Sequence, residues 1–126
     1  KTYYKKHAKV GGNYDRDYQN FDLVGEQNAA LRAVLNYTES RNINIVFVNM
    51  PLTAEYLDNF RQKYEQEFEK YMLNLARRPN FVYRDLSQTW LKANDYFSDP
   101  SHLNRYGAYE VSKKLAKAPM IPWSAK

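Results

Sequence analysis

The chain has 126 residues, no cysteine, and 19 Lys and Arg against 14 Asp and Glu, which gives a formal net charge of +5 at pH 7. Without cysteine there is no disulfide framework and no thiolate metal site, and two histidines fall short of a usual zinc set, so we expect no metal and no cofactor. The length fits one domain at most, and no apolar run is long enough to span a membrane.

Residues 1–20 form a basic and aromatic lead-in. The four lysines between positions 1 and 9 are typical of a solvated terminal tail, and residues 1–10 show no clean hydrophobic period. Gly11, Gly12 and Asn13 then predict a turn.

A helix and a strand are predicted next. The helix covers residues 23–40, because Leu31 and Leu35 belong to a set that repeats at helical spacing. The apolar run at 43–48 is rich in β-branched residues, which is typical of a central parallel strand. Asn49 closes this strand at its carboxyl end, where ligands gather in open α/β sheets. It is a candidate for facing substrate, or for satisfying the loop backbone.

A long helix and a second strand follow. An apolar and aromatic stripe predicts the helix over residues 53–77, and at about 1.5 Å per residue it would extend for roughly 35 Å. Pro79 and its neighbours end it, and the second strand starts at 81–83. Asp85 is interpreted as the cap of a helical turn at 87–91 rather than as a catalytic acid.

The segment Tyr96 to Leu115 carries the strongest chemical signal. Asp99 lies three residues before His102 in a turn marked by Pro100, and Asn104 is a good N-cap for the helix beyond. An imidazole on such a turn can act as a base, with the carboxylate holding the tautomer whose free nitrogen accepts a proton. The alternative is that Asp99 and Asn104 only cap a turn and a helix, and that His102 is an ordinary surface residue.

The run FSDPSHLNRYGA at 97–108 resembles the last conserved block of the SGNH (GDSL-type) hydrolases. The resemblance implies that Asp99 and His102 are two members of a Ser-His-Asp triad. Leu103 and Asn104 are similar to the cell-envelope branches of the family, which include polysaccharide O-acetyltransferase-like proteins. That likeness implies an extracytoplasmic or periplasmic location.

Two asparagines enter as pocket candidates through the same resemblance. Gly11, Gly12 and Asn13 are similar to the G-x-N-D block of SGNH hydrolases, although Tyr14 stands where the family has Asp. Asn13 is therefore a candidate oxyanion donor. In the family a strand that ends in proline forms one wall of the pocket, which makes Asn49 the second candidate.

The order of elements predicts a doubly wound, three-layer α/β domain with a parallel sheet, as in SGNH hydrolases and flavodoxin. Its strand ends would bring Asn49, Asp85 and the Asp99 turn to one rim. Only two strands are predicted, fewer than an open sheet normally has, so we expect residues 1–126 to be a single partial domain, the C-terminal half of a larger one. The tail at 118–126 is expected to lie over the surface.

We therefore expect the chain to supply His and Asp to a serine esterase or O-acyltransferase acting on acyl esters, including polysaccharide esters. None of the six serines lies in a G-D-S or G-x-S-x-G context, so the serine is expected upstream of Lys1 and the chain alone should be inactive. Its partners would be the ester and the missing N-terminal part of the same protein.

Two alternatives stay open. One is a non-catalytic module whose basic, tyrosine-rich surface binds an anionic glycan or, less expected, a nucleic acid. The other is a degenerate family member retained for assembly. The binding module predicts that His102→Ala changes nothing.

Overall fold

The structure, a computed structural model, describes residues 2–123. The larger elements are two strands and three helices, in chain order α2 (Glu26–Glu39), β1 (Ile45–Asn49), α3 (Asn59–Leu75), β2 (Phe81–Asp85) and α4 (Arg105–Ala116). The shorter ones are α1 (Thr2–His7), η1 (Asp15–Tyr18), η2 (Asn94–Tyr96), β3 (Phe97–Asp99) and β4 (His102–Leu103).

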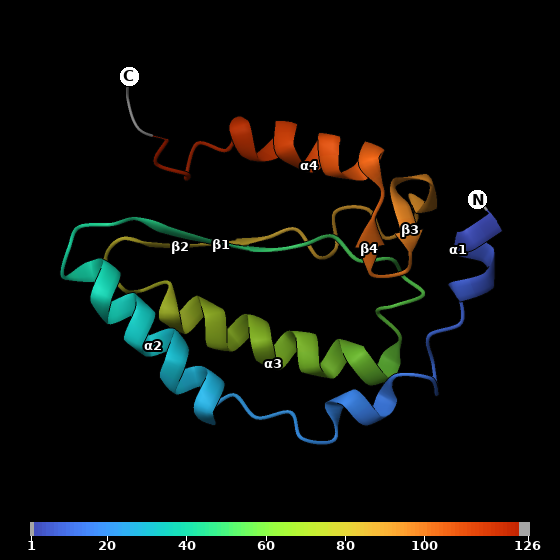
Figure 1. Ribbon diagram of the computed structural model, residues 1–126, viewed down its shortest axis with the longest axis horizontal. Coiled ribbons are helices and arrows are strands. Elements are labelled where there is room, and N and C mark those ends of the chain that lie inside the picture. Colours follow the sequence, from blue (N-terminus) through green and yellow to red (C-terminus); the bar gives the residue numbers. More distant parts are fainter. Residues whose placement is uncertain (1, 124–126) are drawn as a thin grey trace.

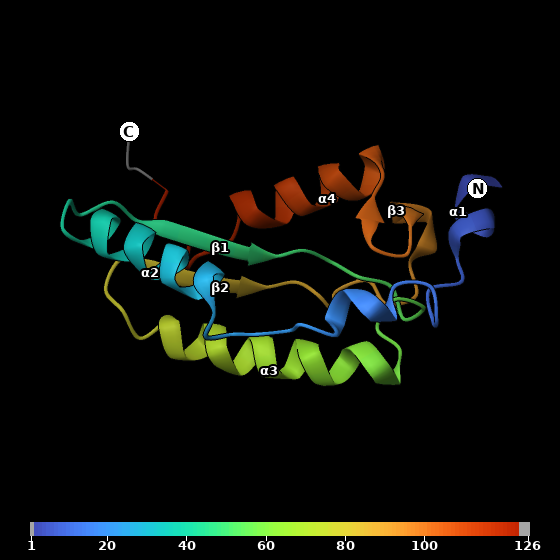
Figure 2. The same cartoon turned by 60° about the horizontal axis from the view of Figure 1, so that its bottom comes forward.

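Strands β1 and β2 form a parallel pair, with Ile45 opposite Phe81 and Asn49 opposite Asp85. Helix α4 lies on one side of this pair, and α2 and α3 lie on the other (Figures 1 and 2). The predicted α/β class and the parallel pairing are therefore confirmed. Both strands point their carboxyl ends toward the β3–β4 turn (Figure 2).

The main core lies between the strand pair and helices α2 and α3. Alternate strand residues face it, because successive side chains of a strand point to opposite faces. Its fully buried members are Leu35, Met72, Leu75, Phe81 and Tyr83. Half-buried side chains pack around them, among them Leu31, Ile45, Phe47, Phe68 and Tyr71. This core uses the helical and strand patterns that the sequence displays.

Helix α3 begins later than the sequence predicts. Asp58 caps it by accepting a hydrogen bond from the Arg61 backbone N–H at 3.0 Å, so residues 53–57 lie outside the helix. Thr53 is fully buried there, and both its N–H and its hydroxyl donate to the Pro100 carbonyl, at 3.1 and 2.9 Å. The start of the predicted long helix is thus wrong, because this segment instead supports the Asp99 turn.

Two further local predictions differ from the structure. Residues 2–7 form helix α1, which packs against β3, although residues 1–10 show no helical period. The helical turn predicted at 87–91 consists of hydrogen-bonded turns without a helix, although Asp85 does accept a hydrogen bond from the Ser87 N–H at 2.8 Å. The tail as far as Trp123 packs back on α4, since the indole N–H donates to the Leu115 carbonyl.

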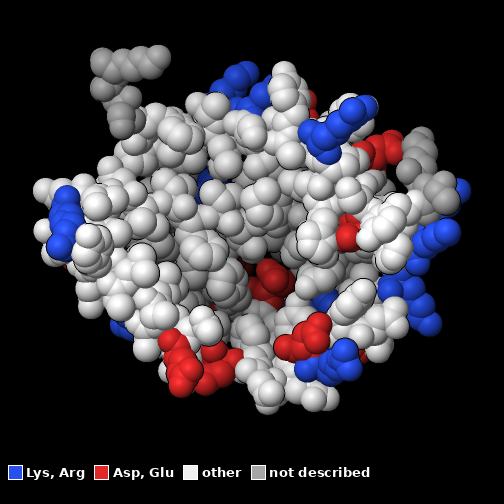
Figure 3. Space-filling view, viewed as in Figure 1, with Lys and Arg blue, Asp and Glu red and all other residues white. Residues whose placement is uncertain are grey.

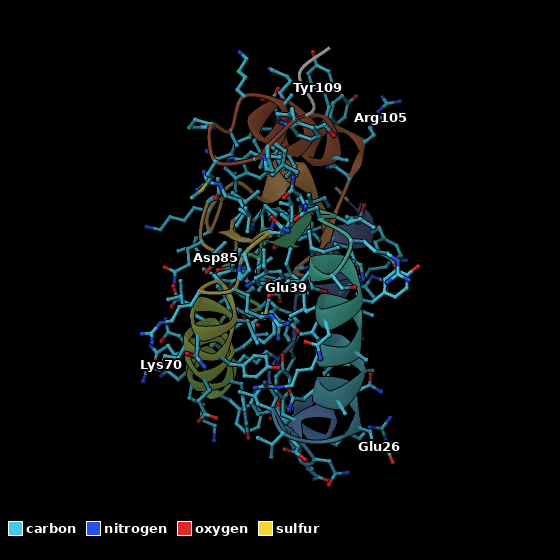
Figure 4. The ribbon with its side chains drawn as sticks, turned by 90° about the vertical axis from the view of Figure 1, so that its left-hand side faces the viewer. Glu26, Glu39, Lys70, Asp85, Arg105 and Tyr109 are labelled. Atoms are coloured by element: carbon cyan, nitrogen blue, oxygen red, sulfur yellow. The ribbon has the colours of Figure 1, made fainter. Side chains whose placement is uncertain are left out.

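Charged groups are distributed widely. In Figure 3 most Lys and Arg lie toward the outline of the face shown, while Asp and Glu lie both in its central hollow and toward its outline. In Figure 4, Lys70 projects outward from α3, and Arg105 and Tyr109 project from α4. Between residues 2 and 123, no helix combines the length and apolar character needed to cross a lipid bilayer.

Candidate active site

The β3–β4 turn is shaped by the Asp99 carboxylate. Asp99 Oδ1 accepts hydrogen bonds from the backbone N–H groups of Ser101 and His102, both at 3.0 Å. An aspartate that bonds its own backbone two residues on forms an Asx turn, and Pro100 fixes the conformation between them. The residue that would orient the histidine therefore also builds the turn that carries it.

The two side chains meet. His102 Nδ1 lies 2.8 Å from Asp99 Oδ1 and 3.0 Å from Oδ2. An ionised carboxylate only accepts hydrogen bonds, so Nδ1 carries the proton and Nε2 is left as the free acceptor. The His102 side chain is 76% exposed and the Asp99 side chain only 21%. This is the arrangement of a histidine whose reactive nitrogen can be reached from outside.

The carboxyl group of Asp99 is held ionised. Burial by itself would raise its pKa, but the hydrogen bonds from the His102 ring and from the Ser101 and His102 N–H groups outweigh burial and lower the pKa below its ordinary value. The stability that these contacts contribute is therefore present above the ordinary pKa of an aspartate. It is lost as the pH falls through the lower pKa of the folded state.

Helix α4 fixes the far side of the turn. Asn104 Oδ1 accepts hydrogen bonds from the backbone N–H groups of Tyr106 and Gly107, which confirms the predicted N-cap. Its Nδ2 donates to the carbonyl groups of Asp95 and Phe97, at 2.6 and 3.3 Å. One asparagine thus joins the helix start to both η2 and β3.

Gly107 lets α4 approach closely. A Cβ at this position would collide with the backbone carbonyl oxygen of Tyr96 and crowd the Leu103 side chain. Backbone cannot move aside as a flexible side chain can, so the position accepts only glycine without displacing the helix.

A cavity of about 350 Å³ lies in front of the histidine. Its walls come from α1, from the η1 region, from Tyr56 and from the Asp99 turn. The lining residues are Tyr3, His7, Val10, Tyr14, Asp17, Tyr18, Tyr56, Asp99, Pro100, Ser101 and His102. Sequence reasoning missed the first two walls, although Tyr3 and His7 are spaced four residues apart, as on one helix face.

A larger hollow of about 950 Å³ lies on the other flank of α1, lined by Tyr4, Lys5, Ala8, η2 and the start of α4. Neither Asp99 nor His102 lines it. We take the smaller cavity as the candidate site because it contains the only acid and imidazole pair that the structure brings together within residues 2–123.

The two candidate asparagines lie elsewhere. Asn13 donates from Nδ2 to the Lys9 carbonyl at 2.7 Å and does not line the cavity. Asn49 lies at the end of β1 and donates to Glu65 Oε2 at 3.3 Å. Both amides are therefore engaged in contacts away from His102, and the structure does not bring Asn49 or Asp85 to the rim of that cavity.

Glu65 lies in a separate polar cluster, where it accepts a hydrogen bond from Asn49 and is affected by the charge of Asp85. Burial raises the pKa of the Glu65 carboxyl group, the Asn49 hydrogen bond lowers it, and the Asp85 charge raises it again, with a net increase. Within residues 2–123, no group of three or more His, Asp or Glu is arranged to hold a metal ion. The raised pKa of Glu65 means that its ionised carboxylate is a local electrostatic cost to the folded state.

Replacing Glu65 by glutamine is expected to stabilise the protein at pH 7, by about 2–4 °C in Tm. Because the folded pKa is raised, the ionised form opposes folding, and stability should increase as the pH falls through that pKa toward the ordinary value of 4.5. Glutamine can still accept the Asn49 hydrogen bond. Thermal unfolding at pH 7 and pH 4.5 measures the effect, and Glu67→Gln, at an exposed position on the same helix outside this cluster, is the control. A lower Tm at pH 7 for Glu65→Gln alone would contradict this interpretation.

No serine within residues 2–123 hydrogen-bonds to Nε2 of His102. Ser101 is the nearest in sequence, but its Oγ lies 3.2 Å from Nδ1, the nitrogen already occupied by Asp99. Ser40 and Ser112 donate instead to backbone carbonyls of their own helices, and Ser124 lies outside the described residues. A nucleophile for this histidine is thus not found among the serines that the structure describes.

No protein family model, no curated protein and no solved structure matches this chain.

Proposed function

We propose that Asp99 and His102 are the acid and base of a serine-dependent esterase or O-acyltransferase site that acts on acyl esters. In this site His102 Nε2 takes the proton from a serine hydroxyl as the serine attacks the ester carbonyl. It later returns the proton to the leaving group. Asp99 orients the ring and stabilises the imidazolium. The single observation that supports the proposal most is the Nδ1 to carboxylate contact of 2.8 Å on a ring whose other nitrogen is accessible.

In this proposal the serine comes from a segment outside residues 2–123, and so do further strands of a doubly wound, three-layer sheet. The Ile45 N–H donates to the Asn80 carbonyl, and the Asn49 carbonyl accepts from the Leu86 N–H. In a parallel ladder alternate residues bond to the same neighbour, so Val46 and Val48 turn their polar backbone groups to the opposite edge. All residues of β1 remain only half-buried, as is usual for a strand that still has room for a neighbour.

Comparing the 126-residue chain with an N-terminally longer form that contains the serine tests both the external serine and the additional strands. The 126-residue chain should hydrolyse p-nitrophenyl acetate no faster than its own His102→Ala variant, whereas the longer form should hydrolyse this ester catalytically. The amides of Val46 and Val48 should exchange with solvent at least about a hundredfold more slowly in the longer form.

Three results would count against the proposal. Hydrolysis by the 126-residue chain that disappears in His102→Ala would show that no external serine is needed. Equal exchange at Val46 and Val48 in both forms would show that β1 gains no neighbour. Salt-sensitive binding of an anionic polymer with no hydrolysis in either form would favour the non-catalytic binding module instead.

A further inference from the structure

The cavity in front of His102 differs in charge from the rest of the chain. The chain as a whole carries a net charge of +5, yet no Lys or Arg lines the cavity. Two carboxylates do, Asp17 on η1 and Asp99 on the turn. With both imidazoles neutral, the lining therefore bears only negative charge.

Two arginines, Arg61 and Arg16, contact residues of the cavity lining, and both are paired with carboxylates. Arg61 lies behind Tyr18 and Tyr56, but Asp15 and Asp58 each contact its guanidinium at 2.7 Å. That group of three therefore carries a net negative charge. The pairing of Asp17 with Arg16 is weak and solvated, because the two charged groups are 3.9 Å apart and the Asp17 side chain is 60% exposed. Its carboxylate remains able to interact with a ligand.

The remaining wall is aromatic. Tyr3, Tyr14, Tyr18 and Tyr56 all line the cavity, and Tyr3 and Tyr14 are each more than half exposed. The face of an aromatic ring attracts cations, and cages of tyrosine with nearby carboxylate suit ammonium groups. This cluster already accommodates one cation, because the Arg61 guanidinium lies 5.5 Å from the centre of the Tyr56 ring and 5.7 Å from that of Tyr18.

We propose that this cavity binds the positively charged, amine-bearing part of the substrate and discriminates against carboxylate and phosphate groups. The inference rests on the proposed function, because it specifies that the ester substrate carries a cationic group on either its acyl or its acceptor side. It follows from the lining, because an ammonium group gains from the tyrosine faces and from Asp17. An anion would meet two carboxylates and no basic partner.

The test uses choline and its neutral isostere 3,3-dimethyl-1-butanol, which differ in charge and hardly in shape. Binding to the 126-residue protein is followed by NMR through the ring signals of His102 and His7, at pH 8, where ordinary histidines are neutral. Choline should bind at least about threefold more tightly than the isostere, and acetate and inorganic phosphate should shift neither ring. Equal or tighter binding of the isostere, or saturable binding of either anion, would overturn the inference.

A pair of charge variants makes the test specific. Asp17→Asn should remove most of the preference for choline over its isostere, because it deletes the solvent-exposed carboxylate of the cavity without changing the size of the side chain. Glu67→Gln, an exposed position on α3 outside the cavity, removes the same charge and should leave the preference unchanged. If both variants lower choline binding equally, the effect is one of net charge and the cavity has no special role.

Failure of this inference can be separated from failure of the proposed function. Choline binding needs no serine, so it can succeed while the longer form hydrolyses nothing. Conversely, if the longer form hydrolyses 3,3-dimethylbutyl acetate as fast as acetylcholine, the proposed function stands and the cation preference of the cavity is refuted.

Discussion

Replacing His102 by alanine in the serine-containing form is expected to lower kcat for an acyl ester by about 10⁶, the loss that follows removal of a triad histidine in a comparable hydrolase. Asp99→Asn should lower kcat by a factor of about 10⁴, because the amide can no longer hold the proton on Nδ1 and the ring adopts the wrong tautomer. The side chain of asparagine has the same size, so the turn should be retained. Steady-state hydrolysis of p-nitrophenyl acetate measures both effects.

Ser101→Ala is the matched control for this series. Ser101 lies next to the same two groups, with its Oγ 3.3 Å from Asp99 Oδ1, but it faces the wrong ring nitrogen for attack. We expect its loss to change kcat by less than about tenfold, since a positioning contact is weaker than a reacting group. A Ser101→Ala loss as large as that of His102→Ala would make Ser101 the nucleophile. A His102→Ala variant with full activity would show that His102 is not the base of the reaction.

Neutralising both carboxylates around Arg61, as Asp15→Asn with Asp58→Asn, is expected to lower the free energy of unfolding by about 3 kcal/mol. The Arg61 side chain is completely buried and its charge cannot reach water. Without counter-charges its desolvation is uncompensated. The two carboxylates are themselves about one-third exposed, which keeps the estimate at the lower end of the range for buried pairs. Urea unfolding gives the value.

Arg61→Met provides the sharper comparison. It removes the buried charge and keeps most of the apolar stem, while the remaining carboxylates can be solvated, so it should cost less than the double asparagine variant. Adding Arg61→Met to that double variant should then restore part of the stability. Asn at position 58 can still cap α3, which excludes loss of the cap as the cause. If the triple variant is less stable than the double variant, then Asp15 and Asp58 do not act by compensating the buried charge of Arg61.

The sequence predicted the parts of the fold that depend on local pattern. The repeats around Leu31 and Leu35 correspond to α2, and the apolar run before Asn49 corresponds to β1. Asn104 caps α4 as predicted. These features were accessible because periodicity and capping act over a few residues. The contact between Asp99 and His102 was accessible for the same reason, since an Asx turn brings residues three apart together.

The parts that sequence did not predict depend on residues far apart in the chain. Arg61 reads as an ordinary polar position on a long helix, yet it is buried because Asp15 reaches it from 46 residues away. Thr53 leaves the helical pattern to bond Pro100, 47 residues on. The cavity walls from α1 and η1 follow from such contacts. A single sequence gives no local sign of them. The expected convergence of Asn49 with His102 is not found, and the Asn49 amide donates to Glu65 instead.

The place of Gly107 against Tyr96 has a consequence for finding related chains. An acid and a histidine three apart occur often by chance, and also requiring an asparagine two positions after the histidine and a glycine three positions later makes a chance match much rarer. Any residue larger than glycine at this position would push α4 away from the β3–β4 turn that the helix stabilises. A sequence search that requires all four positions would therefore exclude many more chance matches than a search for the acid and histidine alone.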